Sequence, residues 1–249
     1  MTRHSLSRYS VLLMMLAAVA ALAGCVNANE NGSGSGSSSA PTFGNGDVTA
    51  GRDGAHTVNG SVRVPDGTQT GNVGTVNGSI HVGENATLLQ GQTVNGSISL
   101  GARASADQLT TVNGSISLSD EAHVAHTVQT VNGSLTLHNG SQVGGALTNV
   151  NGTIELTAAR VSGGIRTANG DINVGGHSQV DGGILVQKPS GMFEFMQHAP
   201  RVVIGPGVVV NGELRFERKV ELYVSDRATI GPVVGATAVR YSGEAPPAG

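Results

Sequence analysis

The chain has 249 residues, a formal net charge of −3 and a single cysteine. Its scattered lysines and arginines form no basic patch of the kind that binds nucleic acid, and one cysteine excludes an internal disulfide. Aromatic residues make up 3% of the chain and tryptophan is absent, whereas 38 residues are glycine without a collagen period. We therefore expect a narrow interior filled by valine, isoleucine, leucine and alanine.

Residues 1–24 have the pattern of a targeting segment. Two arginines give a basic start, and the apolar run over 11–23 is too short for a comfortable membrane span. The run ends in Leu22-Ala23-Gly24-Cys25, which resembles the lipobox of bacterial lipoproteins. The resemblance implies cleavage before Cys25 and lipidation of Cys25 with several acyl chains, which make a stable membrane anchor. The alternative is an ordinary signal peptide followed by an incidental cysteine.

Residues 25–46 are predicted to be a tether behind the lipidated Cys25. They are rich in Asn, Gly and Ser and contain few apolar residues, which is the composition of a flexible linker. Val26 follows the cysteine, and by analogy with lipoproteins this favours the outer membrane of a bacterial envelope, on its periplasmic or surface face.

The pentapeptide Thr-Val-Asn-Gly-Ser, or a looser form of it, returns through the middle of the chain. Successive asparagines are 18 or 19 residues apart, and a fixed period of this size indicates one structural unit stacked on itself. The repeated asparagines are Asn59, Asn77, Asn95, Asn113, Asn132, Asn151 and Asn169.

Apolar residues occupy alternate positions around each asparagine. Val94 precedes Asn95, and Ile98 and Leu100 follow it, which is typical of a strand with one buried face. Each unit holds about three short strands separated by glycine-rich corners, and one unit cannot bury its apolar residues alone. The predicted fold class is therefore all-β: a single-stranded parallel β-helix with turns of about 18 residues. Parallel connections are normally right-handed, so we expect a right-handed coil.

The Asn-Gly pair is expected at a corner, because both residues tolerate positive φ. Stacked asparagines can also bond amide to amide along the column, so we predict a structural ladder of the seven asparagines. The pair is a hairpin signal in isolation, and Asn-x-Ser/Thr also matches a glycosylation acceptor. The identical flanks in every copy favour the ladder.

The β-helix is predicted to cover residues 47–241, with an excursion loop over 187–200. That loop contains two phenylalanines and two methionines, which either fold back on the tube wall or contact a partner or membrane. A further Asn-Gly corner is expected at Asn211, and the charged turns near the C-terminus suit a cap over the end of the tube. Residues 242–249 are predicted to be a flexible tail.

No catalytic, metal or cofactor site is predicted. Polysaccharide-processing β-helices need clustered carboxylates on one face, but the outward column from Arg63 to Asn173 contains no acidic stack. His177 and Asp181 lie in a glycine-rich segment that does not meet the repeated pattern of a calcium-binding nonapeptide. We interpret them as solvated corner residues.

A candidate ligand strip borders the asparagines. If the side chains two residues before and after each asparagine face outward, they form a flat strip rich in hydroxyl and amide groups. Such a strip suits a repeating ligand such as a polysaccharide or ice, or it is simply a soluble, β-favouring ladder face. Its proposed members are Thr75, Thr93, Thr111, Ser79, Ser97 and Ser115.

Residues 57–231 resemble the bacterial putative-adhesin β-helix domains, which carry the same Val-Asn-Gly-(Ser/Asp)-Ile string. The turn length is also similar to that of the bactofilins, polymer-forming cytoskeletal β-helices. The first resemblance, with the lipobox, implies a non-enzymatic, lipid-anchored envelope protein with a structural or adhesive scaffold role. The alternatives are a polysaccharide-binding or -processing β-helix protein and a self-assembling, bactofilin-like polymer. The expected partners are the membrane and either an envelope polysaccharide or further copies of the chain.

Overall fold

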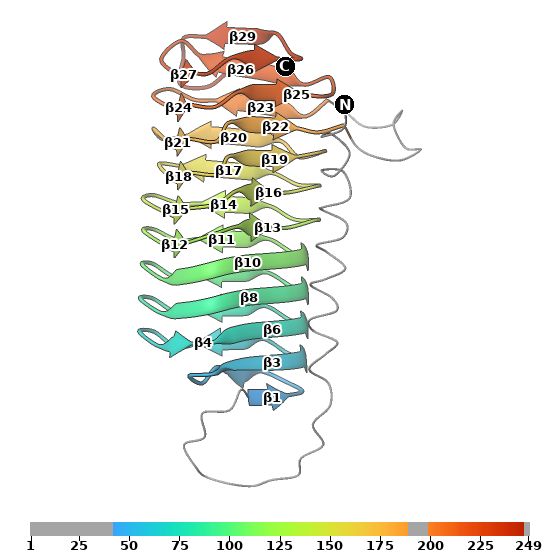
Figure 1. Cartoon of the computed structure of the whole chain (residues 1–249), viewed down its shortest axis with the longest axis vertical. Coiled ribbons are helices and arrows are strands. Elements are labelled where there is room, and N and C mark those ends of the chain that lie inside the picture. Colours follow the sequence, from blue (N-terminus) through green and yellow to red (C-terminus); the bar gives the residue numbers. More distant parts are fainter. Residues whose placement is uncertain (1–41, 189–198, 247–249) are drawn as a thin grey trace, which may run out of the picture.

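The structure is a computed structural model that describes residues 42–188 and 199–246. Within these residues the chain is a stack of short parallel strands that runs along the long axis of the molecule, from β1 at one end to β29 at the other (Figure 1). The predicted all-β parallel β-helix is therefore confirmed, and its right-handed sense stays a prediction. No helix of the described ranges is long and apolar enough to cross a membrane.

One face of the stack is a sheet of eleven strands, which receives one strand from every turn. Ten steps of about 4.8 Å make this sheet about 48 Å tall. Its strands are β2 (Val48–Thr49), β4 (Val62–Val64), β7 (Ile80–Val82), β9 (Ile98–Leu100), β11 (Ile116–Leu118), β14 (Leu135–Leu137), β17 (Ile154–Thr157), β20 (Ile172–Gly175), β23 (Arg201–Ile204), β26 (Glu221–Ser225) and β29 (Ala238–Tyr241).

The remaining strands form a second sheet of eighteen strands. In β8 and β10 the second and third strands of a turn run together, whereas later turns break them into two, as β12 and β13 show. The predicted three strands per turn are thus clearest in the C-terminal half. The strands are β1 (Thr42–Gly44), β3 (Gly54–Asn59), β5 (Gln69–Thr70), β6 (Asn72–Asn77), β8 (Thr87–Asn95), β10 (Ser105–Asn113), β12 (His123–Val124), β13 (Val128–Gln129), β15 (Gln142–Val143), β16 (Leu147–Thr148), β18 (Arg160–Val161), β19 (Ile165–Thr167), β21 (Gln179–Val180), β22 (Ile184–Val186), β24 (Val209–Val210), β25 (Leu214–Phe216), β27 (Thr229–Ile230) and β28 (Val233–Val234).

The interior is a set of aliphatic columns in strict register. Ile98 pairs with Ile80 on one side and with Ile116 on the other, and all three side chains are fully buried. The core members lie between Ala50 and Val224, and the strand pairings lie between Thr42 and Tyr241. Residues 42–246 therefore contain both sheets and one continuous core, so a fragment from Thr42 onward is a self-contained folding unit.

The boundaries differ from the sequence prediction at both ends of the stack. The first strand, β1, begins at Thr42, inside the segment that we assigned to the tether. Near the other end, residues 242–246 fold back, and Glu244 forms an ion pair with Arg227, so this part of the expected tail is held by the body.

The expected excursion falls between two strands of the stack. Arg201 and its partner Asp171 are 30 residues apart rather than 18 or 19, and the stack resumes at β23 in register with β20. Residues 189–198 of this loop lie outside the described residues. The signal peptide, Cys25 and the tether up to residue 41 do so as well.

Candidate functional site

The repeated asparagines form a continuous amide ladder on the outside of the stack. Each Nδ2 donates to Oδ1 of the asparagine one turn earlier, from Asn77 onto Asn59 at 3.0 Å to Asn169 onto Asn151 at 2.9 Å. The four intermediate bonds measure 2.8–3.0 Å. The structure therefore brings all seven predicted ladder residues into one column.

The ladder ends on a charged residue at its C-terminal side. Oδ1 of Asn169 has no further asparagine above it, and instead accepts a hydrogen bond from the guanidinium of Arg218, which also donates to the carbonyl of Ala168. A cationic donor at this point satisfies the last acceptor of a polarised amide column. The later Asn211 does not join the ladder, because it lies above Asp181 at a different corner.

The glycine after each asparagine is required for a reason that differs from our prediction. The ladder asparagines do not have positive φ, and of the glycines that follow them only Gly60 and Gly152 do. What these glycines share is contact with the preceding turn: a Cβ on Gly96 would lie 1.8 Å from the carbonyl oxygen of Gly78. Positive φ in non-glycine residues is instead found at another corner, at Asn85, Arg103, Glu121, Ala158 and His177.

The prediction that the threonines face outward is wrong. Thr75, Thr93 and Thr111 are at most 3% exposed. Each Oγ1 donates to the carbonyl of the corner glycine one turn earlier at 2.9 Å, as Thr93 does to Gly78. That carbonyl is packed against the next glycine, and burying it unpaired would cost about 1–3 kcal/mol. The threonines thus belong to the stacking machinery and drop out of the candidate ligand strip.

The serines of the candidate strip remain at the surface. Ser79 and Ser115 are partly buried and Ser97 is exposed. Each hydroxyl accepts a hydrogen bond from the next turn's backbone, as Ser79 does from the amide of Ser97 at 3.2 Å. Together with the asparagines they form a narrow hydrophilic ridge.

Because the threonines point inward, the valines between threonine and asparagine point outward, opposite to our expectation. The alternation of apolar residues does not continue through the corner, so counting by twos across it assigns the wrong face. Val58 is 40% exposed, and the other five valines are partly buried. They form a column of Val58, Val76, Val94, Val112, Val131 and Val150 on the outer surface of the eighteen-stranded sheet.

Two uncharged polar columns lie beside these valines on the same outer surface. Gln92 is in register with Thr110, and Gln90 with Gln108. The intervening Gly91 and Leu109 are buried, which fixes the outward direction of their neighbours. We call the whole surface the valine–glutamine face; it consists of the six valines with His56, Asn72, Gly74, Gln90, Gln92, Gln108, Thr110, Thr127, Gln129 and Thr148.

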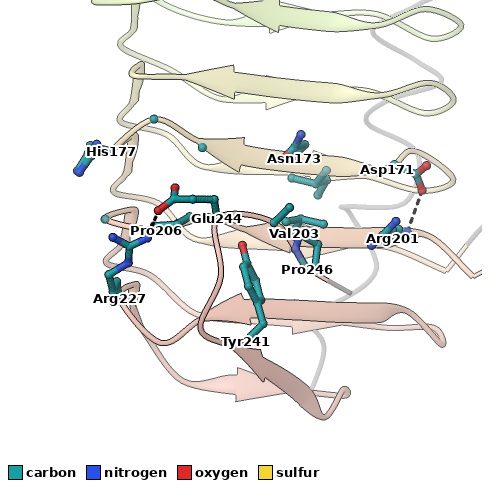
Figure 2. A pocket seen from close by; sticks show the side chains of 16 residues that line it. Asp171, Asn173, His177, Arg201, Val203, Pro206, Arg227, Tyr241, Glu244 and Pro246 are labelled. Carbon is teal, nitrogen blue, oxygen red and sulfur yellow. Dashed lines mark hydrogen bonds and ion pairs between the residues drawn. The ribbon is translucent and has the colours of Figure 1, made fainter. Parts of the chain in front are cut away.

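A depression of about 820 Å³ lies against the eleven-stranded sheet near the C-terminus (Figure 2). The fold-back of residues 242–246 forms one wall, and Arg201 and Tyr241 line the depression. The Tyr241 hydroxyl donates to the carbonyl of Ile204 at 3.3 Å, and burial, with the nearby Glu244 carboxylate, raises the pKa of Tyr241.

The two acidic residues that line this depression are engaged in structural contacts. Glu244 is paired with Arg227, and Asp171 accepts from the backbone amide of Arg201 at 2.8 Å (Figure 2). The geometry is therefore that of a docked C-terminal segment and does not present two free carboxylates for acid–base chemistry.

The Asp181 carboxylate is likewise committed to a corner of the stack. The Asp181 carboxylate accepts from the side chains of Gln179, Asn211 and Arg160 at 2.7–2.9 Å, and these hydrogen bonds lower the pKa of Asp181. Among the described residues, no group of three or more His, Cys, Asp and Glu side chains is placed to hold a metal ion.

The fold and these surfaces define the class of protein as a parallel β-helix with an external amide ladder. In comparisons with known proteins, the chain matches no family model, no curated protein and no solved structure. The resemblances to the putative-adhesin domains and the bactofilins therefore remain those of the repeat itself.

Proposed function

We propose that this protein is a non-enzymatic, lipid-anchored scaffold of a bacterial cell envelope, with a structural or adhesive role. The observation that carries the proposal is the commitment of the repeated side chains to stacking. Asparagine, threonine and serine columns all bond from one turn to the next, so the repeat is used to make a long rigid body. The lipobox at Cys25 supports the attachment of this body to a membrane.

A lipidation and fractionation experiment tests this proposal. The full chain is expressed in a Gram-negative host with a labelled fatty acid, beside a Cys25→Ala variant. The wild-type protein should carry label and sediment with the outer membrane, whereas Cys25→Ala should carry none and leave the membrane fraction. Unlabelled wild-type protein in the cytosol would refute the anchor and, with it, the envelope role.

A polysaccharide-binding role is the second candidate, and the exposed ridge of asparagines and serines favours it. Each ladder amide uses one N–H and one carbonyl lone pair within the ladder, which leaves the other donor and acceptor directed at solvent. A polymer with a regular hydroxyl spacing is a suitable ligand for such an array. Binding to envelope polysaccharides that is abolished by Ser97→Lys but kept by Ser99→Lys, on the eleven-stranded sheet, would support this role.

A further inference from the structure

The valine–glutamine face contains no Asp, Glu, Lys or Arg side chain, whereas the other surfaces of the same region do. Residues 54–150 contain seven charged residues, and none of them lies in the columns of this face; they are Arg63, Asp66, Glu84, Arg103, Asp107, Asp120 and Glu121. Asp107 borders the face and is paired with His126 at 2.6 Å. A partner that covers this face would therefore desolvate no unpaired charge. Desolvation of an unpaired charge is the largest penalty in forming an interface.

The valine column gives the face an exposed apolar line at positions where contact with water would favour polar side chains. A sheet with one face in water normally alternates apolar residues inside with polar residues outside. Here six consecutive turns place valine on the outside at the same position. Burying such a line against an apolar surface is favourable by about 25 cal/mol per Å².

The polar side chains of the face form hydrogen bonds to other side chains of the same turn. The Gln92 amide donates to Oε1 of Gln90 at 3.3 Å, and the Gln129 amide donates to Oγ1 of Thr127 at 3.4 Å. These bonds survive when water is removed, so a flat partner can cover the groups at a smaller desolvation cost than for unpaired amides.

We propose that two copies of this chain associate through the valine–glutamine face in an antiparallel, two-fold symmetric arrangement. A face whose columns repeat at the strand spacing is matched best by a second stack with the same spacing, since both repeat at about 4.8 Å. A two-fold axis perpendicular to the stack and lying in the interface leaves the valine column opposite the partner's valine column. An axis along the stack through the middle of the face would instead place valines opposite Gln90 and Gln108.

The area of the face is sufficient for a weak, specific dimer. Six turns and the width of three columns make a patch of about 29 Å by about 20 Å, taken from the strand spacing and rise. The two copies would together bury ~1,200 Å², which is the lower limit for stable protein interfaces. The association is independent of the lipid anchor, because every residue of the interface lies in the β-helix.

The oligomeric state of the fragment 42–249 tests the association. Sedimentation equilibrium should show a monomer–dimer equilibrium for the wild-type fragment. The double variant Val94→Lys, Val112→Lys places ammonium groups opposite each other across the two-fold axis and should raise the dimer Kd at least about 100-fold. The matched control is Ser99→Lys, Ser117→Lys, in the same two turns on the eleven-stranded sheet, which should leave the Kd within about twofold. Circular dichroism verifies that both variants are folded.

Disulfide cross-linking tests the antiparallel arrangement. The fragment lacks Cys25, so each variant carries one cysteine. Val76→Cys and Val131→Cys, mixed under mild oxidation, should give a mixed disulfide far faster than either variant alone. A parallel arrangement would instead link Val94→Cys to Gln90→Cys.

Three results would overturn the proposal. The first is a wild-type fragment that stays monomeric at millimolar concentration, and the second is a dimer that the valine double variant leaves intact. Preferential linkage of Val94→Cys to Gln90→Cys is the third.

Discussion

The corner glycines of the ladder give the sharpest test of the stacking mechanism, and Gly96→Ala is the representative change. The added Cβ would lie 1.8 Å from the Gly78 carbonyl oxygen and 2.4 Å from its carbon. Both are backbone atoms of the neighbouring turn, so the two turns must separate by more than 1 Å to relieve the contact.

Such a separation weakens three hydrogen bonds that depend on the spacing of these turns. They are Thr93 Oγ1 to the Gly78 carbonyl at 2.9 Å, Asn95 to Asn77 at 2.9 Å, and the Gly78 amide to the Asn95 carbonyl at 3.0 Å. At about 1 kcal/mol each, with about 1–3 kcal/mol for the overpacking itself, the free energy of unfolding should fall by about 4–6 kcal/mol. This corresponds to a decrease in Tm of roughly 8–24 °C for a domain of this size.

The assay is urea and thermal unfolding of the fragment 42–249, followed by circular dichroism. Gly51→Ala is the matched control, since a Cβ there meets nothing within 4 Å and the backbone does not have positive φ. Gly67→Ala is a second control that isolates the effect of positive φ, because its surroundings are equally open. If Gly96→Ala unfolded with the same midpoint as Gly51→Ala, close approach would not be the reason for the repeated glycine.

Three further changes probe other parts of the same structure. Ala158→Gly should stabilise the fragment by about 0.5–1 kcal/mol in urea unfolding. Glycine removes left-handed strain at φ 49°, and this gain exceeds the cost of the greater entropy of the unfolded chain. A loss of stability would contradict this. Asn113→Leu should destabilise the fragment by about 1–3 kcal/mol, since it leaves two ladder neighbours without their amide partner, whereas Ser117→Lys should change stability little; equal effects would mean that the ladder is not structural. Burial lowers the pKa of His56, so the unfolded state binds the proton more tightly and stability should decrease as pH falls below about 6.5. His56→Gln should reduce this decrease between pH 7 and pH 5, and an unchanged pH profile would count against it.

The sequence was sufficient to predict the stack and its register. The aliphatic residues at Ile98 and Leu100 and their equivalents recur at a fixed distance from the asparagine, and a periodic position can pair only with itself in the next turn. The amide ladder followed from the same periodicity. Both predictions rest on sequence spacing, because residues that are one period apart lie next to each other in neighbouring turns.

The direction of the threonines and valines could not be obtained in this way. Period-two counting assumes an unbroken strand, and Asn95-Gly96 interrupts it. The inward position of Thr93 is decided by the buried carbonyl of Gly78, an acceptor that is contributed by another turn and exists only once the stack has formed. The threonine half of the candidate ligand strip failed for this reason, and the valine–glutamine face was missed although its valines repeat as regularly as the asparagines.

The sixth repeat of the chain shows what the threonine position requires. At the sixth repeat an asparagine, Asn149, replaces the threonine and is 2% exposed. Its Nδ2 donates to the carbonyl of Gly133 at 3.1 Å, which is the bond that threonine makes elsewhere, and to the carbonyl of Gly152 at 2.9 Å. The replacement is chemically different from threonine but keeps a donor on the same carbonyl. The requirement at this position is therefore a buried hydrogen-bond donor. A position that faced a ligand would not need a residue that donates to this carbonyl.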